Sequence, residues 1–159
     1  MKIFLYLLVI SFNNFYFQNK FDYKLERNMF NISLINEYKK NKINIKKINN
    51  NEEFEGRYLG NFKTNSGKNF FLLVSTYIFD KNSLAKTENH IFIYNDKKQY
   101  VGYYYLSQMY DLPIKLENNK LYFKNKDCNE KTIINLNNGI PRAINLKCKN
   151  KNNYYEFQI

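Results

Sequence analysis

The chain has 159 residues, a formal net charge of +11 at pH 7, 44% hydrophobic residues and 18% aromatic residues, which is too apolar for a disordered chain and suits one domain with its own core. A single His and two Cys exclude a structural zinc site made of four Cys, or of two Cys and two His, and any mechanism that needs two imidazoles. Length and composition alone identify no biochemical activity.

The positive charge is weak evidence for nucleic-acid binding. Asn, Lys, Ile, Tyr and Phe dominate the sequence, and A/T-rich codons encode all five, so codon usage at surface positions explains much of the charge. Arg, whose planar fork binds phosphates and bases through two hydrogen bonds, occurs only at Arg27, Arg57 and Arg142. The composition therefore disfavours nucleic acid as a partner but leaves it as an alternative.

Residues 1–18 have the pattern of a secretory signal peptide. Lys2 precedes the uncharged run IFLYLLVISF, a short apolar core behind a positive charge that is too short to cross a bilayer as a helix. The residues around Phe17 and Gln18 lack the small side chains typical of a cleavage site, so an uncleaved tether and an N-terminal core strand remain alternatives. We expect a secreted, periplasmic or cell-envelope protein with no transmembrane helix in its mature chain.

Residues 19–53 predict one amphipathic helix followed by a polar linker. Apolar side chains recur at spacings of three and four residues, at Leu25, Met29, Ile32, Ile35 and Tyr38. The helix should end near residues 39–40, and a short edge strand is expected at residues 43–45.

Residues 54–159 predict a series of β-hairpins. Turn residues stand at 65–67, 96–97 and 118–119, between runs of alternating or continuous apolar residues. The expected cross-strand pairs include Tyr58 with Val74, Gly60 with Leu72, Phe62 with Phe70, Phe92 with Val101, and Ile93 with Tyr100. A last strand is expected at residues 154–159.

The two cysteines favour a disulfide across a further hairpin. A three-residue loop at 137–139 places Cys128 directly opposite Cys148 and collects the apolar residues of both strands on one face. Such a bond would contribute about 3 kcal/mol in the chain-entropy model, and it agrees with export to an oxidising compartment. Two buried free thiols are the alternative.

These elements together predict an all-β fold. We expect an antiparallel meander of about eight strands, either a curled sheet or a small up-and-down barrel, preceded by one short N-terminal helix. The expected organisation is a signal peptide at 1–18, helix and linker at 19–53, and a β-meander domain at 54–159.

No group of residues predicts catalysis, a metal site or a cofactor site. His90 is the single imidazole, and neither a nucleophile nor an orienting carboxylate is predicted beside it. The carboxylates of Glu52, Glu53 and Glu55 lie in one polar stretch typical of a solvated surface. We therefore expect no catalytic, cofactor-binding or metal-ligating residues.

Aromatic residues around the predicted central strands form the candidate binding surface for a ligand or partner. This surface consists of His90, Tyr100, Tyr103, Tyr104 and Tyr105. Exposed aromatic rings on a basic sheet can stack on bases, although core packing is the simpler explanation for tyrosines in a β protein.

The pattern Gly56-x-Tyr58 at the start of the meander resembles the Gly-x-Trp signature of lipocalins over three residues, with Tyr in place of Trp. The resemblance implies a barrel that holds a small apolar ligand. Our leading interpretation is a small exported, non-enzymatic β domain that binds a protein partner or is an accessory of the cell envelope. The lipocalin-like barrel and a basic nucleic-acid-binding domain are the alternatives.

Overall fold

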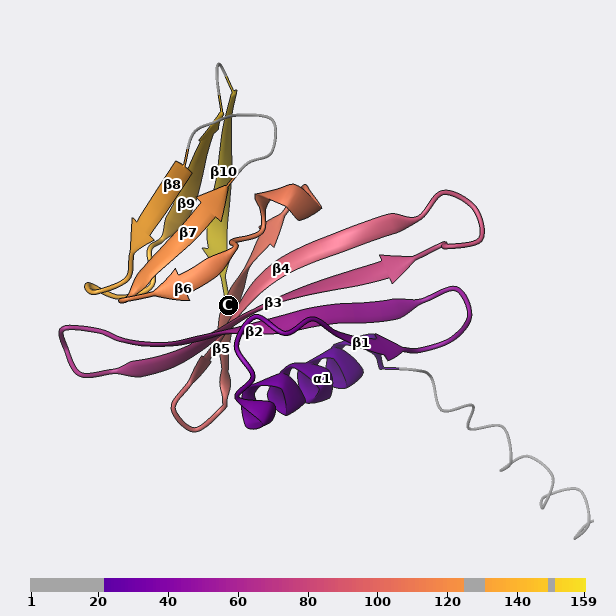
Figure 1. Cartoon of the computed structure of the whole chain (residues 1–159), viewed down its shortest axis with the longest axis horizontal. Helices are drawn as coiled ribbons and strands as arrows, with labels where there is room; N and C mark the ends of the chain where they lie inside the picture. The colour runs from indigo at the N-terminus through magenta and orange to yellow at the C-terminus, as the bar shows by residue number, and fades with distance from the viewer. Residues whose placement is uncertain (1–21, 125–130, 149–150) are drawn as a thin grey trace, which may run out of the picture.

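The computed structural model describes residues 22–124, 131–148 and 151–159, without the side chains of Cys148 and Lys151. This part of the chain contains helix α1 and two antiparallel sheets, one of seven strands and one of three (Figure 1). The predicted signal peptide at 1–18 lies outside the described residues. Within them, no helix combines the length and the apolar character needed to cross a membrane.

The large sheet begins as a meander and is completed by the end of the chain. Its strands are β1 (Asn44–Lys47), β2 (Glu53–Lys63), β3 (Asn69–Phe79), β4 (Lys86–Asn95), β5 (Tyr100–Leu106), β10 (Lys151–Gln158) and β9 (Ala143–Cys148), in this spatial order. The predicted all-β meander, with a helix before it, is confirmed. The sheet is open, with β1 and β9 at its edges, so the closed barrel does not form.

The three-stranded sheet covers one face of the large sheet. It follows the 3-10 turn η1 (Met109–Asp111) and consists of β6 (Lys115–Glu117), β7 (Lys120–Lys124) and β8 (Lys131–Asn135). Leu116, Leu121 and Phe123 of this sheet are buried against apolar residues of the large sheet. The main core therefore lies between the two sheets.

Helix α1 (Tyr23–Glu37) covers the opposite face of the large sheet and encloses a second core (Figure 1). Strand β4 shows the division, because Ile91 and Ile93 enter the core between the sheets, whereas Tyr94 is buried on the helix side with Phe92 partly buried against it. A strand with both faces covered reads as continuously apolar, which is the pattern that predicted a central strand here.

The buried face of α1 agrees only in part with the predicted one: Ile35 is fully buried and Ile32 packs partly buried against the helix-side core, as expected. Leu25 and Met29 are 55% and 47% exposed, and the helix instead buries Phe30 and Leu34. These two side chains pack directly on Gly56, where a Cβ atom would lie 2.8 Å from each of them. The glycine of the lipocalin-like pattern therefore allows these two helix side chains to pack against the sheet backbone.

The hairpin registers agree with the prediction near two of the three turns. Gly60 pairs with Leu72 and Phe62 with Phe70 as expected, but a bulge beyond Gly60 places Tyr58 opposite Leu73 instead of Val74. The β6–β7 turn at residues 118–119 forms as predicted. In the β4–β5 hairpin the prediction was wrong, because Phe92 lies opposite Tyr103 and Ile93 opposite Gly102.

The hairpin predicted between the two cysteines does not form. Strand β8 pairs with β7 in the small sheet, whereas β9 pairs with β10 in the large sheet, so the geometry that aligned Cys128 with Cys148 is absent. Cys128 and the side chain of Cys148 lie outside the described residues, and the disulfide itself stays a prediction.

Candidate functional site

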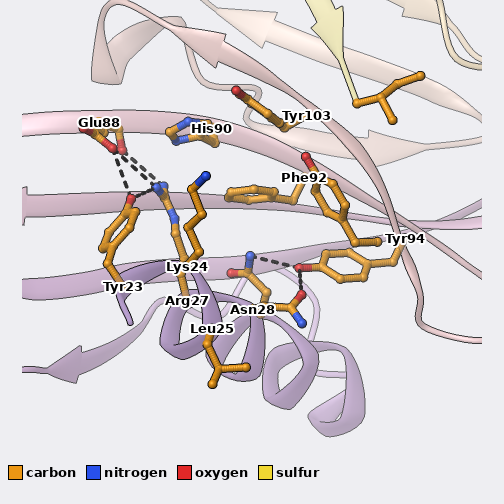
Figure 2. Close-up of a pocket in the computed structure, with 13 residues that line it drawn as sticks. Tyr23, Lys24, Leu25, Arg27, Asn28, Glu88, His90, Phe92, Tyr94 and Tyr103 are labelled. Atoms are coloured by element: carbon orange, nitrogen blue, oxygen red, sulfur yellow. Dashed lines mark hydrogen bonds and ion pairs between the residues drawn. The ribbon is translucent and has the colours of Figure 1, made fainter. Parts of the chain in front are cut away.

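A pocket of about 660 Å³ is bounded on one side by α1 and on the other by the part of β4 and β5 that the helix does not cover (Figure 2). The helix side is lined by Tyr23, Lys24, Arg27, Asn28 and Asn31. The sheet side is lined by His90, Phe92, Tyr94, Tyr100 and Tyr103. The pocket thus has a polar, basic wall on the helix and an aromatic wall on the sheet.

Arg27 forms the base of the helix wall and is only 4% exposed. Its Nη2 donates to the carbonyl oxygens of Ser75 at 2.7 Å and Glu88 at 3.3 Å, and its Nε donates to Ser75 Oγ at 3.3 Å. The guanidinium carbon also lies 4.9 Å from the centre of the Phe92 ring, a cation–π distance. The side chain therefore ties α1 to β3 and β4 and brings a positive charge beside the aromatic wall.

Glu88 is the acidic group at this end of the pocket. Its Oε2 lies 3.8 Å from Arg27 Nη1 and accepts a hydrogen bond of 3.1 Å from the Tyr23 hydroxyl, which in turn accepts one from Arg27 Nη1. Burial is the main reason that the pKa of Tyr23 is raised, so its hydroxyl keeps its proton. Hydrogen bonds and an ion pair thus join Glu88 of the sheet to Arg27 and Tyr23 of the helix.

His90 lies in the aromatic wall and is 8% exposed. Its ring centre is 5.0 Å from that of Tyr103, 5.2 Å from Phe92 and 5.3 Å from Tyr105. Burial, and then the charge of Arg27, lower the pKa of His90 to about 3, so the ring is neutral at pH 7. Its buried Nδ1 has no hydrogen-bond partner among the described residues.

A chain of three polar side chains closes the other end of the pocket. Asn31 Nδ2 donates to the Tyr94 hydroxyl at 3.3 Å, and this hydroxyl donates to Asn28 Oδ1 at 2.8 Å. Asn31 is 1% exposed, and its Oδ1 has no hydrogen-bond partner in the described part of the chain. Asn31 and His90, which both line the pocket, therefore each have one buried polar atom without a partner among the described residues, Oδ1 and Nδ1 respectively.

The structure separates the residues of the predicted aromatic surface. His90, Tyr100 and Tyr103 line the pocket, and Tyr105 lies beside His90 with 43% of its surface exposed. Tyr104 points to the opposite face, where it is 1% exposed and its hydroxyl donates to the carbonyl oxygen of Pro141. Strand alternation accounts for this separation of Tyr104 from its neighbours.

The whole helix wall was missed from the sequence. Lys24, Asn28 and Asn31 recur at helical spacing, which places them on one face. That polar stripe was the available signal, but the helix prediction used only the apolar positions and made no statement about the polar ones. Arg27 and Asn31 are instead buried together with Phe30 and Leu34.

The remaining polar clusters have structural partners. Arg57 donates to the carbonyl oxygens of Pro113 and Ile114, and Glu53 forms an ion pair of 2.5 Å with Lys81. Over residues 22–124, 131–147 and 152–159, no three His, Cys, Asp or Glu side chains gather as a metal site. Two of the three arginines, Arg27 and Arg57, thus bind the protein's own backbone, which leaves them poorly placed to bind phosphates.

The chain matches no known protein family, no curated protein and no solved structure.

Proposed function

We propose that this chain is a non-enzymatic binding protein that holds one small, planar, amphiphilic molecule in the pocket between α1 and the β4–β5 face. The volume of about 660 Å³ lies in the range of small-molecule sites. The proposal differs from the lipocalin-like alternative in its location, because the ligand lies between helix and sheet and not inside a barrel.

The observation that carries the proposal is a pair of partnerless polar atoms, Asn31 Oδ1 and His90 Nδ1, on two residues that line an aromatic pocket. A buried polar atom without a hydrogen bond costs about 1–3 kcal/mol, so such atoms are rare in native proteins. A ligand that donates to Asn31 Oδ1 and bonds to His90 Nδ1 removes this cost, while its ring gains contact with Phe92 and Tyr103.

The electrostatics support binding over catalysis. With a pKa of about 3, His90 is a poor proton acceptor near pH 7, where a general base needs a pKa close to the working pH. Glu88 is already held by Arg27 and Tyr23. The polar groups of the pocket are thus arranged to bind and orient a molecule.

A titration with N-phenyl-1-naphthylamine tests the proposal, because this neutral aromatic amine carries one N–H donor and becomes fluorescent when buried. The purified chain should bind one probe molecule with a saturating curve. Asn28→Phe, which places a ring in the pocket, should weaken binding about tenfold or more, whereas Asn36→Phe on an exposed part of the same helix should not. Non-saturating emission, or equal binding by both variants, would refute the proposal.

We also propose that the chain is exported to the periplasm, the cell envelope or the medium. Support comes from the sequence of residues 1–18, with a positive charge before a short apolar core. Binding a small molecule outside the cytoplasm agrees with this location. A protein partner that binds the chain together with its ligand is also compatible with export.

A further inference from the structure

We propose that the molecule bound in the pocket is a planar aromatic anion whose acidic group binds Lys24. This inference rests on the proposed function and adds the charge of the ligand and the residue that recognises it. Its basis is the distribution of charges around the pocket.

Three charged side chains line the pocket, namely Arg27, Glu88 and Lys24. Arg27 and Glu88 lie 3.8 Å apart and form an ion pair, so their charges compensate each other. No ion pair or hydrogen bond of Lys24 Nζ is present among the described residues, and Figure 2 shows its side chain rising from the helix toward the sheet without a partner. Lys24 is therefore the charged side chain of the lining that has no partner among the described residues.

Two titratable side chains of the lining carry no charge at pH 7. His90 is neutral at pH 7, and burial raises the pKa of Tyr94 to about 12, so its hydroxyl stays uncharged as well. A cationic ligand would face both Lys24 and Arg27 at short range, which is unfavourable in a partly enclosed site. An anion would instead meet a free ammonium group, with which it can form a charge-assisted hydrogen bond.

The aromatic wall defines the shape of the rest of the ligand. The ring centres of Phe92 and Tyr103 are 6.0 Å apart, and those of Phe92 and Tyr100 are 6.4 Å apart, so the three rings form a continuous surface. Aromatic rings favour offset or edge-to-face contacts with a flat partner. A flat ring on this surface, with its acidic group toward the helix, uses both walls at once.

Two probes that share one scaffold separate this inference from the proposed function. The neutral probe is N-phenyl-1-naphthylamine, and 1-anilinonaphthalene-8-sulfonate adds one sulfonate to it. Both are titrated into the full chain and into two variants that each remove one positive charge, Lys24→Met in the pocket and Lys120→Met on the exposed part of β7. Comparing each probe between chains cancels the different solubilities of the probes.

We expect Lys24→Met to weaken binding of the sulfonate about tenfold, the scale of one charge-assisted hydrogen bond, and to leave binding of the neutral probe within about twofold. Lys120→Met should leave both affinities unchanged, and added salt should reduce the effect of Lys24. The inference is overturned if Lys24→Met leaves sulfonate binding unchanged or weakens both probes equally. If neither probe saturates the chain, the proposed function fails with it.

Discussion

Arg27 on helix α1 and Ser75 on strand β3 are joined by two hydrogen bonds, from Nε to Oγ at 3.3 Å and from Nη2 to the carbonyl oxygen at 2.7 Å. They connect residues 48 positions apart in the sequence. The carbonyl oxygens of Ser75 and Glu88 both accept a hydrogen bond from this one guanidinium. A single buried side chain therefore ties the helix to both β3 and β4.

Replacing this side chain should destabilise the fold. Arg27→Met keeps much of the apolar stem but removes the buried hydrogen bonds to Ser75 and to the carbonyl oxygen of Glu88, and we expect a loss of about 2–3 kcal/mol. Urea unfolding measures the change. Arg142→Met, at an exposed position, should stay within about 0.5 kcal/mol, and equal losses in the two variants would contradict the structural role of Arg27.

The buried His90 should make stability depend on pH. Its pKa is about 3 in the folded chain and 6.5 ordinarily, so the unfolded chain takes up a proton as the pH falls below 6.5, while the folded chain does so only near 3. The contribution of neutral His90 to the free energy of unfolding is fully present above pH 6.5. It is lost as the pH falls toward 3, by up to about 1.4 kcal/mol per pH unit.

The difference between wild type and His90→Phe isolates this effect, because the carboxylates titrate in both chains. Urea unfolding at several pH values between 7 and 4 should show a smaller loss of stability in His90→Phe. Since the chain contains one His, its imidazole NMR signal needs no assignment and should not titrate between pH 8 and pH 5. Titration near pH 6.5 would show that the ring is not buried as described.

Gly102 should not tolerate a side chain. A Cβ atom there would lie 2.3 Å from the carbonyl oxygen of Gln158 and 2.3 Å from the ring of Phe157, so β10 would have to move away from β5. We expect Gly102→Ala to cost about 3 kcal/mol, at the upper end for overpacking. Gly56→Ala meets only the side chains of Leu34 and Phe30 and should cost less in the same urea assay.

Export and the disulfide can be tested together by intact mass. Protein from envelope and cytosolic fractions of the native host is measured with and without reductant and alkylation. Cleavage after residue 18 and a mass deficit of two protons that reductant reverses would support export and a Cys128–Cys148 bond. A full-length, reduced, cytosolic chain would contradict both and would restore interest in the basic surface as a nucleic-acid site.

Local turn chemistry was the most predictable part of the fold. Asn118 and Asn119 both have positive φ, of 50° and 56°, which Asn tolerates better than most residues, and the hairpin forms where the pair stands. The β4–β5 turn was misassigned because Lys98 takes a φ of 59° and Asn95 bonds to Gln99, which makes the loop longer than two residues. Lys carries no sequence signal for that conformation.

The long-range pairing and the pocket were less predictable. Residues 131–148 form two plausible facing strands, but β8 and β9 each find a partner in a different sheet, a choice made by packing and not by local sequence. Hydrophobic periodicity placed Ile35 correctly but missed Arg27 and Asn31, which are buried through hydrogen bonds to the sheet. His90 and Tyr103 were identified as candidates, while Lys24 was missed with the rest of the helix wall.

Among the described residues, every hydrogen bond that links α1 to the large sheet involves a side chain, and the backbone of the helix shares no ladder with the strands. The helix can therefore open as its own cooperative unit while the sheet keeps its amide protection. A molecule held between the two would bind only the closed form, so its binding free energy would appear directly as slower hydrogen exchange in α1. The dynamics of one helix would then report the occupancy of the site.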